Sequence, residues 1–250
     1  MSAAQPADVV IVADEQALAR TVAERFAAQA GAALDARGCF RVALAGGSTP
    51  RAAYALIAAT YRDAVEWDRV SFYFGDERCV PPDHDDSNYK MAKTAMLDPL
   101  GVPPERVFRM HGEDEPEAAA RSYAELLQRE LPAPNGAPTF DLVMLGMGPD
   151  GHTASLFPGS DPLQDDDKLV RAPFVPKFGT HRITLTPKVL NAARVVEVAT
   201  AGPSKTDALA AALEGPFDPG NLPIQILKPV PGRLVWLVDR AAAAKLTRTA

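Results

Sequence analysis

The sequence has little of what stabilises small secreted domains or membrane proteins. Of its 250 residues only two are cysteines, Cys39 and Cys79, and they form neither a Cys-x-x-Cys pair nor a zinc-ligand set. A disulfide framework is therefore excluded, and reduced thiols are expected. The N-terminal residues lack a basic segment followed by an apolar run, and no apolar stretch is long enough to cross a bilayer. We expect a cytoplasmic protein without a signal peptide or membrane contact.

Positively charged residues are fewer than negatively charged ones. The chain has 26 lysines and arginines against 32 acidic residues, a formal net charge of −6. This negative field disfavours broad binding to nucleic acid, and an anionic small molecule would need a local cluster of cations. Hydrophobic residues make up 47% of the chain, as in ordinary globular proteins. One large α/β domain, residues 1–250, fits this length better than two small ones.

Short apolar runs alternate with helical patterns along the chain. We expect strands at 8–12, 41–45, 70–74, 107–110, 140–145, 182–185, 194–200 and 234–238. We expect helices at 15–34, 50–59, 87–97, 115–131, 203–213 and 241–246. This alternation predicts a mostly parallel, twisted sheet with helices on both faces, a Rossmann-like α/β fold. Ligands of such sheets bind beyond the carboxyl ends of the strands, so the residues after each strand are the functional candidates.

A glycine-rich turn follows the second expected strand. It consists of Gly46, Gly47, Ser48, Thr49 and Pro50. Its backbone N–H groups can approach a ligand closely, and the start of the next helix favours phosphate. Thr49 is expected to cap that helix, with Pro50 in its first position. A plain strand-to-helix turn fits the same residues, and the missing Gly-Lys-Ser/Thr excludes a Walker A loop.

Three charged residues follow the third expected strand. They are Asp76, Glu77 and Arg78. Arg78 can bind phosphate or carboxylate through two parallel hydrogen bonds. A solvated charge run with an internal ion pair is the alternative. The aspartates around His84 fit no standard metal-ligand spacing, so we expect no metal there and no cofactor, and Ser87 is expected to cap the next helix.

The most informative stretch, residues 146–159, follows the most apolar strand. Gly146, Gly148 and Gly151 form a Gly-x-Gly-x-x-Gly pattern. A dinucleotide site would need an unbroken helix next, and an acidic residue about 20 positions further on. Pro158 and Gly159 interrupt any such helix, so the pattern is weak evidence for a dinucleotide.

Asp150 and His152 within this stretch suggest acid–base chemistry. A histidine after a strand, with a carboxylate two residues away, suits a general base near neutral pH. Which of the two takes the proton stays open, and a purely structural histidine is the alternative. The backbone N–H groups of Gly148 and Gly151 are candidates to stabilise an oxyanion. Ser155 lacks the Gly-x-Ser-x-Gly setting of a nucleophile.

Lys205 is the last candidate. It lies just after Gly202, in the first turn of an expected helix. A cation at that position opposes the helix dipole, which suggests a compensating anion. A solvated lysine is the alternative.

Taken in order, these segments resemble the signatures of the 6-phosphogluconolactonases. The matching segments are 44–50, 75–81, 87–89, 146–159, 182–186, 189–191, and Gly202 with Lys205. The resemblance implies a Rossmann-like fold shared with glucosamine-6-phosphate deaminases, which binds a sugar phosphate and no dinucleotide. It also implies hydrolysis of 6-phosphogluconolactone, the second step of the oxidative pentose phosphate pathway, without a metal. The only partner expected is this small molecule, with the chain a monomer or a weak homodimer.

The resemblance assigns roles to individual residues. His152 would be the general base, with Asp150 as its neighbour. Phosphate and substrate contacts would come from Gly46, Gly47, Ser48, Thr49, Arg78 and Lys205. Arg182 matches the family motif, but whether it contacts substrate stays open. His181 and His84 receive no role, and Cys79 occupies a variable position.

Three other functions remain as alternatives. A glucosamine-6-phosphate deaminase shares the sheet and parts of the glycine loops, although segments 75–78 and 153–158 resemble the lactonases. A non-catalytic sugar-phosphate sensor is disfavoured because Asp150 and His152 are both present. A nicotinamide-dependent oxidoreductase rests on the glycine spacing alone.

Overall fold

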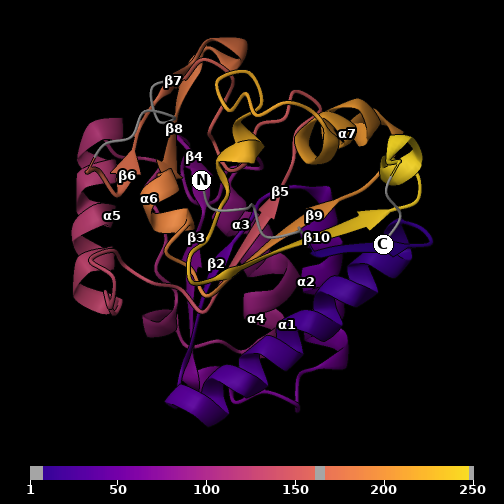
Figure 1. The fold of residues 1–250 in the computed structure, drawn as a ribbon. Helices are drawn as coiled ribbons and strands as arrows, with labels where there is room; N and C mark the ends of the chain where they lie inside the picture. Colours follow the sequence, from indigo (N-terminus) through magenta and orange to yellow (C-terminus); the bar gives the residue numbers. More distant parts are fainter. Residues whose placement is uncertain (1–7, 161–166, 248–250) are drawn as a thin grey trace.

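The central element of the fold is a parallel sheet. A computed structural model of the protein describes residues 8–160 and 167–247 (Figure 1). Six strands pair in the order β1-β10-β9-β5-β2-β3, and each neighbouring pair is parallel. Their bounds are β1 Asp8–Val12, β2 Phe40–Leu44, β3 Val70–Phe74, β5 Leu142–Gly146, β9 Val195–Thr200 and β10 Arg233–Asp239. The predicted Rossmann-like sheet is confirmed.

Helices cover both faces of this sheet, as Figure 1 shows. They are α1 Glu15–Arg37, α2 Ser48–Thr60, α3 Asn88–Ala92, α4 Asp98–Leu100, α5 Pro116–Glu130, α6 Pro187–Leu190 and α7 Thr206–Glu214. A π-helical segment, Lys93–Leu97, joins α3 to α4. Within the described part of the chain, no helix combines the length and apolarity needed to span a membrane.

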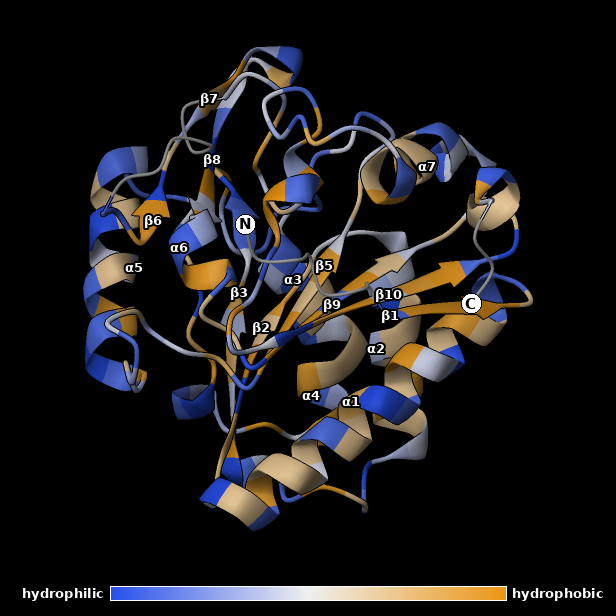
Figure 2. Ribbon diagram, viewed as in Figure 1, coloured by the Kyte–Doolittle hydropathy of each residue, from blue (hydrophilic) through white to orange (hydrophobic). Residues whose placement is uncertain are grey.

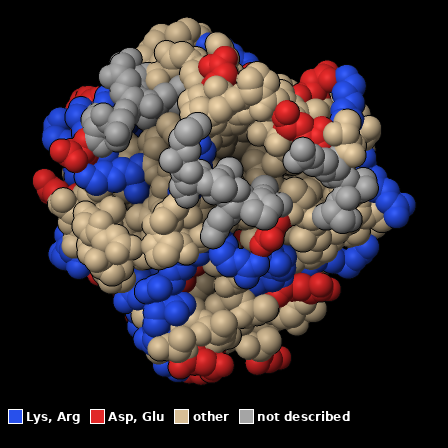
Figure 3. Space-filling view, in the orientation of Figure 1, with Lys and Arg blue, Asp and Glu red and all other residues tan. Residues whose placement is uncertain are grey.

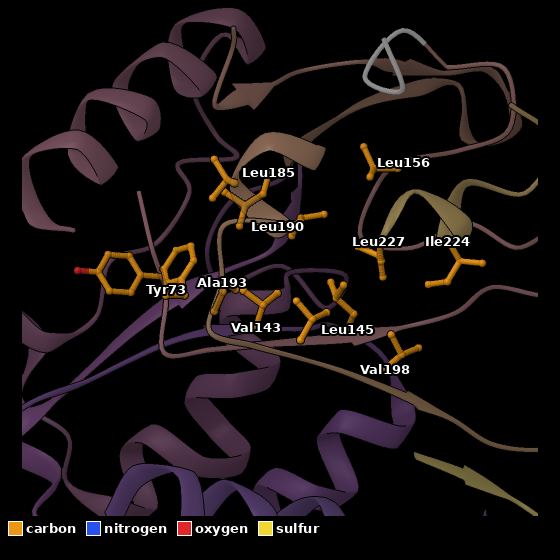
Figure 4. Close-up of a cluster of buried hydrophobic side chains, with 14 of the residues drawn as sticks. Tyr73, Val143, Leu145, Leu156, Leu185, Leu190, Ala193, Val198, Ile224 and Leu227 are labelled. Carbon is orange, nitrogen blue, oxygen red and sulfur yellow. The ribbon is translucent and has the colours of Figure 1, made fainter. Parts of the chain in front are cut away.

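The core forms two layers because side chains alternate along each strand. Leu142 and Met144 of β5 pack with α1 and α2, whereas Val143 and Leu145 face the opposite layer. Figure 4 shows that second layer, and Figure 2 shows apolar residues concentrated along the central strands. Burial on both faces explains why β5 is an uninterrupted apolar run.

A small antiparallel sheet lies beside the carboxyl ends of the central strands. It contains β4 Asp76–Arg78, β6 Val170–Arg171, β7 Phe174–Val175 and β8 Thr180–Leu185. Only β8 is expected from the sequence, because strands of two or three residues show no measurable period. The expected strand at 107–110 is wrong: in the described chain this stretch forms a single bridge between Phe72 and Val107.

Helix starts differ in detail from expectation. Ser87 caps α3 as predicted, accepting a hydrogen bond from the backbone N of Lys90 at 3.1 Å. The predicted cap at Thr49 is wrong, because α2 begins at Ser48 and has no side-chain cap. Segment 203–213 begins as the 3-10 turn Pro203–Lys205 before α7, and the expected last helix is the 3-10 turn Ala242–Lys245.

The strand connections reverse direction between β2 and β5. From β2 the chain continues to the edge strand β3, whereas from β5 it continues towards β9 on the other side. A parallel sheet opens beyond its strand ends at such a reversal of direction. The turn after β2 and the loop after β5 therefore both lie at this reversal, where a ligand is expected to bind, with the start of α7 one strand further along.

Candidate active site

His152 lies in the loop after β5 with its ring held on two sides. Its Nδ1 is hydrogen-bonded to Oδ1 of Asp150, and its ring stacks on Phe157 with 4.4 Å between ring centres. No hydrogen-bond partner for Nε2 lies among the described residues. When Asp150 is ionised, Nδ1 carries the proton and Nε2 carries the lone pair. The ring therefore presents its basic nitrogen away from Asp150.

Asp150 is held in its ionised form. Burial opposes its ionisation, but hydrogen bonds from His152 and from Lys177 outweigh burial and lower its pKa to about 2. Nζ of Lys177 donates to Oδ2 of Asp150 at 3.1 Å. A carboxylate with so low a pKa is a weak base, so it is better suited to orienting His152 than to taking a proton.

Gly148 and Gly151 determine the shape of the loop after β5. A Cβ on Gly148 would lie 2.0 Å from Nδ1 of His152, so only glycine leaves room for the ring. The N–H of Gly148 donates to the carbonyl of His152 at 2.8 Å, and that of Gly151 to the carbonyl of Gly148 at 3.0 Å. Because each N–H already has an acceptor, the expectation that these two groups stabilise an oxyanion is corrected.

Arg78 and Arg182 come together in the small sheet. They are directly opposed in the antiparallel pairing of β4 with β8, and both are partly buried. Burial lowers the pKa of Arg182, and the charge of Arg78 lowers it further. Neither guanidinium has a carboxylate at ion-pair distance within residues 8–160 and 167–247. Two like charges side by side favour a bound anion.

Lys205 adds a third partly buried cation. Burial lowers its pKa, Asp150 raises it and Lys177 lowers it, so Lys205 lies within electrostatic reach of both. It forms no ion pair in the described part of the chain. The molecular surface is hollowed between the small sheet and α7 (Figure 3). Lys205 directly precedes α7, one of the elements that border this region.

The glycine-rich turn is joined to the same region by buried polar contacts. A Cβ on Gly46 would lie 1.9 Å from Oδ1 of Asn88, so the turn packs directly on that side chain. Nδ2 of Asn88 donates to the carbonyl of Asp76 at 2.9 Å, and Oγ of Ser155 donates to the Asp76 carboxylate at 2.7 Å. The loops after β2, β3 and β5 are thus interlocked. Ser48 begins α2, whose free N–H groups favour an anion.

Glu77 has a structural role that the charge run does not reveal. It is 2% exposed and accepts hydrogen bonds from the backbone N of Arg78, Asn88 and Tyr89 and from Oγ of Ser87. Burial raises the pKa of Glu77, and the backbone hydrogen bonds, which lower it, offset only part of that rise. The alternative of a solvated charge run is therefore wrong, because Glu77 binds the start of α3.

The other histidines take no part in this cluster. Nδ1 of His181 donates to the carbonyl of Ala172 at 2.8 Å, which ties β8 to the chain before β7. Nδ1 of exposed His84 accepts from the backbone N of Asp86 at 3.1 Å. Cys79 is a free thiol whose pKa is raised by burial.

One group with metal-ligand spacing occurs in the described chain. It consists of His111, Glu113 and Asp114, all exposed. Both oxygens of Glu113 already accept from Arg109, at 2.6 and 2.8 Å. Within the described ranges, no hydrogen bond or ion pair joins this group to His152.

Two residues near Asp150 and His152, Lys177 and Phe178, have no signal in the sequence and belong to a short turn between β7 and β8. Phe157 lies within the lactonase-like segment 146–159, but the sequence assigns it no individual role. A lysine in a Pro-Lys-Phe-Gly turn is indistinguishable from a solvated one until the turn is placed over Asp150.

Comparisons with known proteins show which proteins this chain is similar to. The family model described as glucosamine-6-phosphate isomerases/6-phosphogluconolactonase matches residues 13–236. A 6-phosphogluconolactonase of Nostoc sp. is 39% identical over 241 residues, covering 96% of this chain and 98% of its own. The solved 6-phosphogluconolactonase of Trypanosoma brucei has a TM-score of 0.86 at 28% identity, covering 98% of this chain and 100% of that one.

A more distant structure supports the predicted fold class. A monomeric glucosamine-6-phosphate deaminase has a TM-score of 0.80 at 18% identity, covering 95% of this chain and 99% of that one. At that identity the likeness concerns the fold alone. With the family model spanning most of the sequence, the chain belongs to the glucosamine-6-phosphate isomerase/6-phosphogluconolactonase family.

Proposed function

We propose that the chain hydrolyses 6-phospho-D-glucono-1,5-lactone to 6-phospho-D-gluconate, the second step of the oxidative pentose phosphate pathway. Relatives bearing the name 6-phosphogluconolactonase match nearly its whole length. The observation that carries the proposal is the state of His152. Its Nδ1 is bound to ionised Asp150, and its Nε2 has no partner among the described residues. This is the arrangement that a general base requires.

His152 would activate the attacking water. Nε2 takes a proton as the water oxygen bonds to C1 of the lactone, which gives a tetrahedral oxyanion. The oxyanion then collapses, the bond between C1 and the ring oxygen breaks, and the imidazolium returns its proton to that oxygen. The products are a hydroxyl group and a carboxylic acid that ionises in water. General-base assistance of this kind contributes roughly 10²- to 10⁴-fold in rate.

The phosphate group would be bound away from C1. We assign it to Arg78, Arg182 and Lys205, because all three are partly buried and lack carboxylate partners among the described residues. The turn formed by Gly46, Gly47, Ser48 and Thr49 would supply further contacts through the N–H groups at the start of α2. Binding energy from this remote group positions C1 against His152.

Ring opening of freshly generated 6-phosphogluconolactone tests the proposal. Unphosphorylated gluconolactone is the control, and kcat/KM should be at least about 10²-fold higher for the phosphorylated lactone. A rate equal to spontaneous hydrolysis would contradict it. Release of ammonia from glucosamine 6-phosphate would favour the deaminase, and tight binding without turnover would favour a sensor.

We also propose that residues 1–250 act as one catalytic domain in the cytoplasm, as a monomer or a weak homodimer. The free thiols of Cys39 and Cys79 and the net charge of −6 support a reducing compartment without nucleic-acid partners. The proposed steps use only groups of the protein itself and water, and call for no cofactor. Size-exclusion chromatography with light scattering measures the oligomeric state.

A further inference from the structure

The turn between β7 and β8 reaches back to the carboxylate of Asp150. Lys177 lies in the 3-10 turn Pro176–Phe178, which Gly179 ends in the left-handed conformation with φ of 62°. Its Nζ lies 3.1 Å from Oδ2 of Asp150, 27 residues away in the sequence. The backbone of the turn is closed by the N–H of Gly179, which donates to the carbonyl of Val175 at 3.0 Å. Lys177 is therefore presented by a defined turn.

Aromatic rings hold this turn over the site. Phe178 is 48% exposed, so burial in the core does not fix it. Its ring meets Phe157 edge-on at 5.8 Å, and Phe157 in turn stacks on His152 at 4.4 Å. The charged ends of Lys177 and Arg182 lie 5.6 and 5.0 Å from the centre of the Phe178 ring. The same turn thus contacts the carboxylate that holds the proposed general base, the ring of Phe157 that stacks on that base, and one of the proposed phosphate ligands.

We propose that Lys177 is a positioning residue that fixes Asp150 and, through it, the ring of His152. This inference rests on the proposed function. One carboxylate oxygen of Asp150 is bonded to His152 and the other to Lys177. Two donors on opposite oxygens prevent the carboxylate from rotating, so Nδ1 keeps its acceptor and Nε2 keeps its direction.

Lys177 also neutralises part of the negative charge of Asp150. Among the described residues, the charged groups that face His152 and Asp150 are Lys177 and, within electrostatic reach, Lys205, while the guanidinium of Arg182 lies 5.0 Å from the centre of the Phe178 ring. Without Lys177, the negative charge of Asp150 is balanced less completely. Protonated His152 is then favoured, and a protonated ring cannot act as a base.

Replacement of the lysine separates positioning from substrate binding. Lys177→Met should lower kcat about 10-fold, the size of one charge-assisted hydrogen bond, and change KM by less than about 2-fold. The acidic limb of the kcat/KM profile should move to higher pH by about half a unit. Lys177→Arg, which keeps the charge and the donors, should restore most of kcat. Lys188→Met is the matched control, because Lys188 also pairs with one aspartate, Asp167, at 2.8 Å, and it should behave as wild type.

Two kinetic outcomes would overturn the inference. An unchanged kcat and acidic limb in folded Lys177→Met would show that Asp150 needs no second donor. A raised KM with unchanged kcat would show that Lys177 binds substrate instead.

An NMR titration of the histidine rings tests the same inference without substrate. His152→Asn assigns the His152 resonance among the four histidines of the chain. Its titration midpoint should lie at higher pH in Lys177→Met than in wild type, and an identical midpoint would overturn the proposal. Wild-type protein that titrates as expected but fails to open the lactone would count against the proposed function only.

Discussion

Arg78 and Arg182 lie directly opposite each other across the β4–β8 pair, with no carboxylate at ion-pair distance in the described chain. Like charges opposed in an antiparallel pair destabilise a sheet. Such a pair is useful where an anion binds between the two charges, which is the role we assign to it.

Replacing either arginine should therefore weaken ligand binding more than it weakens the fold. We expect Arg78→Met and Arg182→Met each to reduce affinity for 6-phosphogluconate at least about 10-fold, because a charge-assisted contact is lost. The free energy of unfolding without ligand should stay equal or rise by about 0.5 kcal/mol. Calorimetric titration and urea unfolding measure the two quantities. Exposed Arg20 in α1 provides the control, Arg20→Met, and unchanged affinity in both site variants would contradict the assignment.

Gly148→Ala should reduce turnover by displacing the ring of His152. The new Cβ would lie 2.0 Å from Nδ1 of His152 and 2.6 Å from Oδ1 of Asp150, so their hydrogen bond cannot keep its geometry. We expect kcat to fall about 10- to 100-fold. Gly31→Ala is the control, because nothing lies within 4 Å of its Cβ and it should stabilise α1 by about 0.5–1 kcal/mol. Full activity in Gly148→Ala would show that the ring has room to move.

Glu77→Ala should destabilise the fold. Three backbone N–H groups and the hydroxyl of Ser87 would lose their acceptor inside the protein. The expected loss is about 3–5 kcal/mol in the free energy of unfolding. Glu66→Ala removes a carboxylate that is 64% exposed and paired with Arg69, and should cost less than about 1 kcal/mol. Equal losses in the two variants would remove the structural role assigned to Glu77.

Asp150 should make the free energy of unfolding depend on pH. Its pKa is about 2 in the folded protein against an ordinary 3.8, so the folded state favours the ionised form. The stabilisation is complete above the ordinary pKa and is lost as the pH falls through the folded value. We expect the free energy of unfolding of wild type to exceed that of Asp150→Asn by about 1 kcal/mol near pH 6, after allowance for the partial exposure of Asp150. This difference should vanish near pH 2. Urea unfolding across that range measures it, and a constant difference would contradict the shift.

The sequence predicts the parallel sheet and the position of its functional loops because both depend on local patterns. The apolar run at 140–145 and the glycines around His152 are visible without any tertiary information. The antiparallel pairing that opposes Arg78 and Arg182 is not, because strands as short as β4 are stabilised by contacts far away in the sequence.

Lys177 and the two glycine amides illustrate the same limit. Lys177 becomes relevant only when a turn folds back by 27 residues onto Asp150. The N–H groups of Gly148 and Gly151 look available in the sequence, but the loop uses them for its own closure. Which donors are free is decided by the closed loop and not by the residue type.

The most direct test compares wild type with His152→Asn in two measurements, the binding of 6-phosphogluconate and the rate of lactone ring opening. Binding of 6-phosphogluconate, measured by calorimetry, should change less than about 5-fold, since the cations that hold phosphate are untouched. The rate constant for lactone ring opening should fall by roughly 10²- to 10⁴-fold, because asparagine cannot take the proton from water. Turnover close to wild type in the folded variant would contradict the assignment of His152 as the general base.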